Sequence, residues 1–218
     1  MTRATVKSRV PRKPKVPATA LYKVLVDGRS CHGGSLEWSL PTAKREAFTP
    51  GDWHAVSGDL QLCWHGLHLT TTPAAWWKPG CTIYAAEATG RLVASNEPDG
   101  KVVVARARLL RPLNAKELAA VNIFTEGVHT AKPGLTLALG NSTVTARGNS
   151  TVTARENSTV TAWGNSTVTA RENSTVKCPS NWYWGAPTVK LEGRAVWIDS
   201  RTGTPKIHAV TQPEYVGA

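Results

Sequence analysis

Five near-identical octapeptides between residues 141 and 176 constrain the fold of this chain more than any other feature. The unit reads Asn-Ser-Thr-Val-Thr-Ala-Arg-Gly with small variations, and its Asn recurs at positions 141, 149, 157, 165 and 173. A short, fixed period is the signature of a repeat architecture, in which each unit packs only against its neighbours. We therefore expect this stretch to form a solenoid.

The alternation within each octad predicts a β-strand. In the first copy, Ser142, Val144 and Ala146 share one face, and Thr143 and Thr145 share the other. Val and Thr are typical of pleated strands, whereas Asn and Gly are typical of corners. Because a lone strand cannot bury its Val, successive coils are expected to stack about 4.8 Å apart and to share a core.

The residue before each Asn indicates how many sides a coil has. These residues are Gly140, Gly148, Glu156, Gly164 and Glu172. From the second copy onward Gly and Glu alternate, so two octads per coil place Glu above Glu, whereas three octads would mix the two residue types. We predict a flat, two-sided β-solenoid with about 16 residues per coil. Its Arg-Glu neighbours are expected to offset the stacking of like charges. One sheet is expected to stack Val144, Val160 and Val176, and the other Val152 and Val168.

Turn residues and short alternating runs predict a mainly β protein with five parts. They are a basic extended arm over 1–19, a small α+β domain over 20–113, a helical linker over 114–134, the β-solenoid over 135–178 and a C-terminal β cap over 179–218. Strands are expected over 60–64, 82–88 and 101–110. A capping box of Asn114 and Glu117 predicts a short helix. The aromatic run 181–185 is expected to cover the open end of the solenoid.

Positive charge is concentrated at the start of the chain. The net charge is +11, and no acidic residue precedes Asp27. Such a basic arm containing prolines is expected to be disordered alone and to bind nucleic acid or another anionic surface; the alternative is a solubilising tail. The binding residues would be Arg3, Lys7, Arg9, Arg12, Lys13 and Lys15.

The chain shows no signal for a membrane or for secretion. No apolar run approaches the ~20 residues of a membrane span, and the first residues lack the apolar region of a signal peptide. We therefore expect the virion or the host cytoplasm as the location, with four free cysteines. The Asn-Ser-Thr triplets are interpreted as solenoid corners and not as glycosylation sites.

Residues 28–87 contain the side chains best suited to chemistry. Cys63, His65 and His68 are weak candidates for metal ligands, because structural zinc sites usually show two well-spaced pairs. A nucleophilic pair of Cys31 or Cys63 with a histidine (His54, His65 or His68) gains no support from the spacing. We therefore expect no metal and no cofactor.

Several short segments occur in an order that resembles a known domain. They are Tyr22-Lys23, Ser30-Cys31, Gly51-Asp52-Trp53, Leu62 to His68, Ile83 to Glu87 and Lys101 to Val103. This pattern resembles an uncharacterised domain of bacteriophages and actinobacteria that has a Cys-x-x-Gly-Leu-His core and is often followed by short-period β-solenoid repeats. The resemblance covers roughly residues 20–113 and the repeats. It implies a phage origin but no reaction.

A second resemblance is to ADP-ribosyltransferase-like folds, which bind NAD. It implies catalytic roles for Tyr22, His68 and Glu87, with Gly66 to Thr70 as the strand before a helix. The Arg or His usual in the first strand is absent here. Strand alternation places Glu87 opposite Tyr84, and we expect that side to face solvent.

Three functions follow from these observations. The leading hypothesis is a non-enzymatic phage structural or interaction protein. In it, the arm anchors the chain to a phage or host assembly or to nucleic acid, and the solenoid is a rigid docking surface. The alternatives are an ADP-ribosyltransferase-like enzyme that acts on a host target, and a solenoid that binds water or ice through its outward threonines. No membrane partner is expected.

Overall fold

The structure is a computed structural model that describes residues 20–45, 47–179 and 185–210. The chain divides into two compact units. The first contains the residues up to Thr71 together with Ile83–Arg111, and the second contains Thr72–Thr82 together with the residues from Pro112 onward. The basic arm and residues 181–184 lie outside the described residues, so the expectations for them stay predictions.

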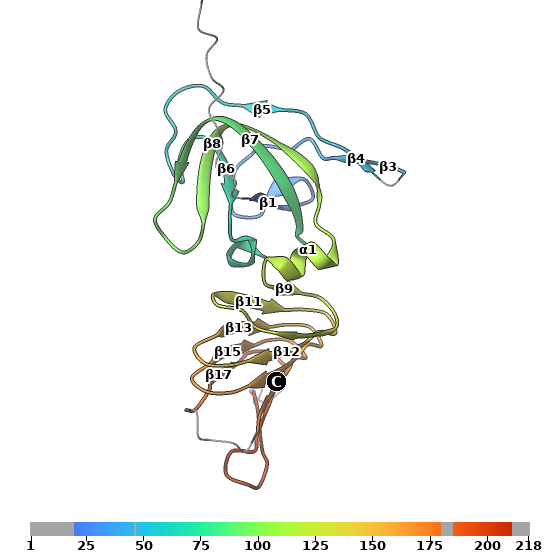
Figure 1. Ribbon diagram of the computed structural model, residues 1–218, viewed down its shortest axis with the longest axis vertical. Helices are drawn as coiled ribbons and strands as arrows, with labels where there is room; N and C mark the ends of the chain where they lie inside the picture. Colours follow the sequence, from blue (N-terminus) through green and yellow to red (C-terminus); the bar gives the residue numbers. More distant parts are fainter. Residues whose placement is uncertain (1–19, 46, 180–184, 211–218) are drawn as a thin grey trace, which may run out of the picture. The chain divides into compact units, whose positions relative to one another are not determined.

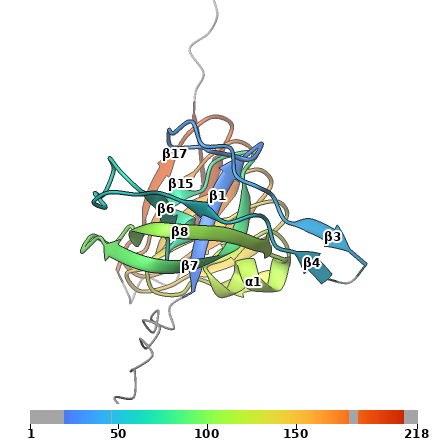
Figure 2. The ribbon, with the colours of Figure 1, turned by 90° about the horizontal axis from the view of Figure 1, so that it is seen from above.

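Four strands of the first unit close into a small β-barrel. The strands are β1 (Leu21–Val26), β6 (Leu67–Thr70), β7 (Thr82–Ala94) and β8 (Lys101–Pro112). β1 pairs with β6, β6 with β8, β8 with β7, and β7 again with β1. Figures 1 and 2 show β7 and β8 side by side. The ring of pairings is complete, although β6 covers only residues 101–104 of the longer β8.

Apolar side chains from all four strands fill the barrel. The interior cluster contains Leu21, Leu25, Trp38, Leu67, Leu69, Ala88, Val102, Val104, Ala107 and Leu109. The short strands β2 (Arg29–Ser30) and β5 (His54–Ala55) extend the sheet from β1 and β8. A separate hairpin of β3 (Thr42–Lys44) and β4 (Ala47–Thr49) is exposed along both strands and projects from the barrel (Figures 1 and 2).

The second unit is a parallel β-solenoid with two facing sheets. One sheet contains β9 (Ile123–Phe124), β11 (Leu135–Ala138), β13 (Thr151–Ala154), β15 (Thr167–Ala170) and β17 (Thr188–Leu191). The other contains β10 (Val128–Thr130), β12 (Thr143–Ala146), β14 (Thr159–Ala162), β16 (Thr175–Cys178) and β18 (Val196–Asp199), to which β19 (Lys206–Ala209) adds antiparallel. Figure 1 shows the strands stacked as successive rungs. The predicted two-sided solenoid with about 16 residues per coil is confirmed.

The solenoid core follows the alternation within the octads. Val144 pairs with Val160 and Val160 with Val176 in one sheet, whereas Val152 pairs with Val168 in the other. All five valines are fully buried, and the Ser and Ala residues of the same parity are also buried. The predicted inner face and both predicted valine stacks are therefore confirmed.

The parallel sheets continue beyond the octads at both ends. Val128 pairs with Thr143, fifteen residues away, and Thr175 pairs with Val196, twenty-one residues away. The extra or missing residues lie in the corners between strands, so the strands themselves still pair in register. The octads thus form the middle of a longer solenoid. The short helix α1 (Ala115–Ala120) precedes it, and the predicted capping box between Asn114 and Glu117 is confirmed.

Each end of the solenoid core contains a stacked aromatic pair. Phe124 stacks on His129 in the first coil, with ring centroids 4.1 Å apart. Trp197 stacks on His208 at the other end, with centroids 4.4 Å apart, and its indole N–H lies 3.2 Å from the Cys178 thiol. Terminal units that differ from the repeats are what a solenoid needs to stop its ends from associating.

Candidate functional site

The outer surface of the sheet that contains β10, β12, β14 and β16 is a regular array of threonines. We call it the threonine face. Its outward side chains form two rows across the strands, the first of Val128, Thr143, Thr159 and Thr175, and the second of Thr130, Thr145, Thr161 and Lys177. Neighbouring residues of a row lie about 4.8 Å apart, and the two rows lie roughly 6.6 Å apart. Among these described residues Lys177 alone carries a charge.

The opposite sheet presents a similar but shorter array. Its outward threonines include Thr151, Thr153, Thr167 and Thr169. The coil before them is covered, because Leu137 is 4% exposed and β11 contacts the 3-10 helix η1 (Pro73–Trp76) of the same unit. On the threonine face, by contrast, Val128 is 81% exposed. The two surfaces therefore differ in their first coil. In the octads, however, Thr151 and Thr167 of the opposite sheet are more exposed than Thr143 and Thr159 of the threonine face.

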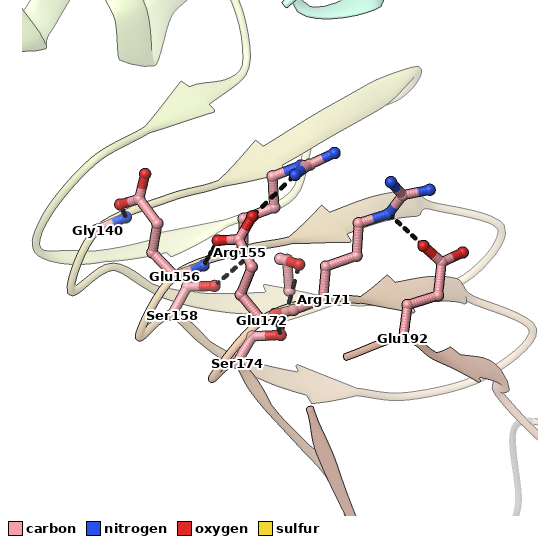
Figure 3. A network of polar contacts seen from close by, with 9 residues as sticks. Gly140, Arg155, Glu156, Ser158, Arg171, Glu172, Ser174 and Glu192 are labelled. Carbon is pink, nitrogen blue, oxygen red and sulfur yellow. Dashed lines mark hydrogen bonds and ion pairs between the residues drawn. The ribbon is translucent and has the colours of Figure 1, made fainter. Parts of the chain in front are cut away.

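One edge of the solenoid carries a ladder of glutamates with left-handed backbones. Glu156 and Glu172 have φ angles of 58° and 57°, in a column that begins with Gly140 at 56°. The Glu156 carboxylate accepts a hydrogen bond from the Gly140 N–H at 2.6 Å, and the Glu172 carboxylate accepts one from the Glu156 N–H at 2.8 Å. Figure 3 shows that the Gly140 and Glu156 amides each donate to a glutamate of the coil that follows.

Arginines on the same edge form ion pairs between successive coils. Arg155 Nη1 lies 2.9 Å from Glu172 Oε1, and Arg171 Nε lies 2.9 Å from Glu192 Oε2 (Figure 3). Each arginine thus pairs with a glutamate of the next coil, which offsets the repulsion between stacked like charges. The predicted compensation is confirmed. The ladder and its ion pairs therefore join the corners of successive coils.

In the barrel unit, the predicted strand over 60–64 is wrong. The chain there makes a tight turn, closed by a bridge between Gln61 and His65, with Cys63 in the left-handed region at φ 69°. The His68 ring accepts a hydrogen bond from the Cys63 N–H at 2.9 Å through Nε2. The hydrogen bond to the His68 side chain stabilises the turn. The alternation of apolar and polar residues gives no sign of such a contact, so it predicted a strand here.

The three weak metal candidates do not form a ligand set. The His65 ring bonds to the Ser57 carbonyl at 2.6 Å, whereas the His68 ring is engaged with the backbone of Cys63. Across the ranges that the structure describes, no three His, Cys, Asp or Glu residues are grouped so that they could hold a metal ion. The Cys63 thiol instead accepts a hydrogen bond from Lys101 Nζ at 3.3 Å.

Two lysines shape the electrostatics of this region. Lys23 is 7% exposed and donates to the His68 carbonyl at 2.9 Å. Burial lowers the pKa of Lys23 to about 8, against an opposing effect of Cys31. Burial and the Lys23 charge lower the pKa of His68, while the hydrogen bond to the Cys63 thiol raises the pKa of Lys101.

The residues assigned to an ADP-ribosyltransferase-like site lie apart along the barrel. Tyr22 pairs with Thr70, so it lies near His68 on the outer side of β1 and β6. His68 pairs with Val103 on β8, whereas Glu87 binds Arg108, five residues further along that strand. Five residues of strand span roughly 16 Å. Glu87 therefore does not meet the other two, and its side chain, 41% exposed, faces away from the barrel core.

Two groups of residues near the barrel surface were not predicted. The sequence predicted Lys101 only as a strand residue, whereas its amine donates a hydrogen bond to the Cys63 thiol. Arg106 and Arg108 were placed on the polar face of their strand, but their common partner, Trp53, depends on the register between β5 and β8. A single sequence contains no signal for that register. The proposed binding residues of the arm, Arg3 to Lys15, lie outside the described residues.

Comparisons with known proteins give no relative from which a role could be transferred. No helix within the described ranges is long and apolar enough to cross a membrane. No family model matches the chain, and neither a curated protein nor a solved structure matches it.

Proposed function

We propose that this protein is a non-enzymatic interaction protein whose threonine face docks onto a partner assembly. In this proposal the solenoid is a rigid platform, and the N-terminal arm supplies a second, electrostatic attachment. The setting would be a bacteriophage particle or its host cell, as the resemblance of residues 20–113 implies. The partner would therefore be a phage or host protein assembly.

The single observation that carries the proposal is the regular and nearly uncharged array of side chains on the threonine face. Val128 is 81% exposed, and at the other end of the same sheet Ile207 is 73% exposed. These two apolar residues lie at opposite ends of the sheet, and the uncharged rows between them have a fixed spacing that suits a partner with a regular surface. A rigid surface also loses little conformational entropy when it binds.

The enzyme alternative has weaker support. Glu87 is engaged with Arg108 at 2.7 Å and lies far along the strand from His68. His68 in turn holds the backbone of Cys63 in place. A catalytic site requires its groups to converge on one reacting atom, and these groups have structural partners instead.

Paired substitutions on the two sheets test the docking proposal. Thr145→Lys with Thr161→Lys places two charges on the threonine face, and Thr153→Lys with Thr169→Lys does the same on the opposite sheet. All four side chains point outward, so both proteins should fold as the wild type does by circular dichroism. Only the first pair should lose co-sedimentation with purified phage particles or with the isolated host assembly. Equal co-sedimentation of both pairs, or none by the wild type, would refute the proposal.

A second candidate function, the binding of ordered water, is favoured by the same face. Threonine hydroxyls and methyls recur there at the strand spacing in two rows. Such a lattice is suited to a periodic, uncharged partner such as an ice surface. Inhibition of ice recrystallisation by the wild type, lost in Thr145→Lys/Thr161→Lys and kept in the control pair, would support this function. Absence of inhibition at high protein concentration would exclude it.

A further inference from the structure

The outer surface of the barrel places two arginines against one tryptophan. The guanidinium carbon of Arg106 lies 4.6 Å from the ring centroid of Trp53, and that of Arg108 lies 4.7 Å from it. The pairing of Ala55 with Arg106 and of His54 with Ala107 puts Trp53 across from Arg108. The arrangement is therefore built into the register between β5 and β8, and it does not depend on long side chains meeting by chance.

The positive charge at this position is only partly balanced. Arg108 forms an ion pair with Glu87, through Nη2 at 2.7 Å and Nε at 2.8 Å. Arg106 is exposed, and no carboxylate of the described residues forms an ion pair with it. Two guanidinium groups held against one ring repel each other. An anion bound beside them would offset that repulsion.

The combination of charge and aromatic surface selects the class of anion. Arginine planes and an indole ring stack on nucleobases, and guanidinium groups bind phosphates in a bidentate manner. Six further lysines and arginines lie between residues 3 and 15 of the sequence. A polymer can neutralise both sets of charges at once, which a small anion cannot do.

We infer that the Trp53–Arg106–Arg108 surface is a binding site for single-stranded nucleic acid. The phosphates would lie against the two guanidinium groups, and a base would stack on the exposed Arg106 beside Trp53. Arg106 makes the decisive contact, because Arg108 is already held by Glu87. This site does not depend on the threonine face, so either proposal can fail without the other.

The experiment measures binding of a fluorescein-labelled oligothymidylate to the full chain by fluorescence anisotropy at several salt concentrations. Arg106→Gln should weaken binding by about five- to twentyfold and lower the slope of log K against log salt by about one. Arg147→Gln removes the same charge from an exposed corner of the solenoid, and it should leave the affinity within about twofold. Trp53→Leu should weaken binding to oligothymidylate more than binding to an abasic oligomer of the same length.

Three results would overturn the inference. The first is no binding by the wild type at low salt. The second is an equal loss from Arg106→Gln and Arg147→Gln, which would indicate unspecific attraction to the net charge. The third is a deletion of residues 1–16 that abolishes binding while Arg106→Gln has no effect, because the arm alone would then be the site. Unfolding curves of each variant check that the barrel stays folded.

Discussion

Substitutions in the glutamate ladder can separate the free energy of its hydrogen bonds from the strain of its left-handed backbone. Glu172 accepts hydrogen bonds from the Glu156 N–H at 2.8 Å and from Arg155 Nη1 at 2.9 Å. Its carboxylate is partly exposed, with the side chain at 42%, so we take about 1 kcal/mol for each bond. Glu172→Ala should therefore lower the free energy of unfolding by about 2 kcal/mol. Glu172→Gly loses the same bonds but relieves a left-handed backbone, worth about 1 kcal/mol, so its net cost should be only about 1 kcal/mol.

A control on the other edge measures the backbone contribution alone. Gly148 has a φ angle of 57°, and an added Cβ would meet nothing within 4 Å. Gly148→Ala should thus cost about 1 kcal/mol, from strain only. That value should equal the difference between Glu172→Ala and Glu172→Gly.

Urea unfolding followed by far-UV circular dichroism gives the free energies, and hydrogen exchange at the Glu156 amide reports on the ladder directly. Both Glu172 variants should accelerate exchange of that amide, and Gly148→Ala should not. A Glu172→Gly protein less stable than Glu172→Ala would refute the reasoning. So would unchanged exchange at the Glu156 amide.

Three further predictions use the core and the titrating groups. Val160→Asp should cost several kcal/mol, because Val160 is fully buried, whereas Thr161→Asp should cost under about 1 kcal/mol; urea unfolding compares them. Lys23 has a pKa of about 8 in the folded protein and 10.5 in the unfolded chain, so only the unfolded state keeps the proton between these pH values. The free energy of unfolding should therefore rise by about 3 kcal/mol from pH 8 to 10.5, and the same rise in a Lys23→Met protein would contradict this. The Arg201 guanidinium lowers the pKa of Asp199 from 3.8 to about 2, so the ion pair stabilises the fold above pH 3.8 and this stabilisation is lost as the pH falls towards 2. In thermal melts, Asp199→Asn should not show this loss of stability.

The solenoid could be predicted in detail because its rules are local and repeated. Alternation placed Val144 and Val160 inside, and the Gly-Glu alternation at the corners gave the number of sides. The coils before residue 135 and after residue 178 were not assigned to the solenoid, because their lengths of fifteen and twenty-one residues break the period. Pairing across a parallel sheet tolerates such changes in the corners, so structure persists where the repeat in the sequence has ended.

The barrel was harder to predict, because its closure depends on contacts that are distant in the chain. β7 was expected to end at Ala88 but continues to Ala94, where it pairs with its long neighbour β8. The turn at Cys63 depends on the His68 ring, and the position of Trp53 depends on a strand register. Neither the ring contact nor the register is visible in local hydrophobic patterns. The candidate residues were therefore found in the sequence, but their actual partners were not.

The glutamate column also restricts how the length of this protein can change. Insertion of two octads would add one complete coil, about 4.8 Å of height, and would leave Gly140 at the first corner and Trp197 at the last coil with their present neighbours. Insertion of a single octad would move every later strand to the opposite sheet and would exchange the glycine and glutamate corners. Gains and losses in units of sixteen residues are thus structurally silent, and the solenoid can serve as a spacer whose length is adjusted one coil at a time.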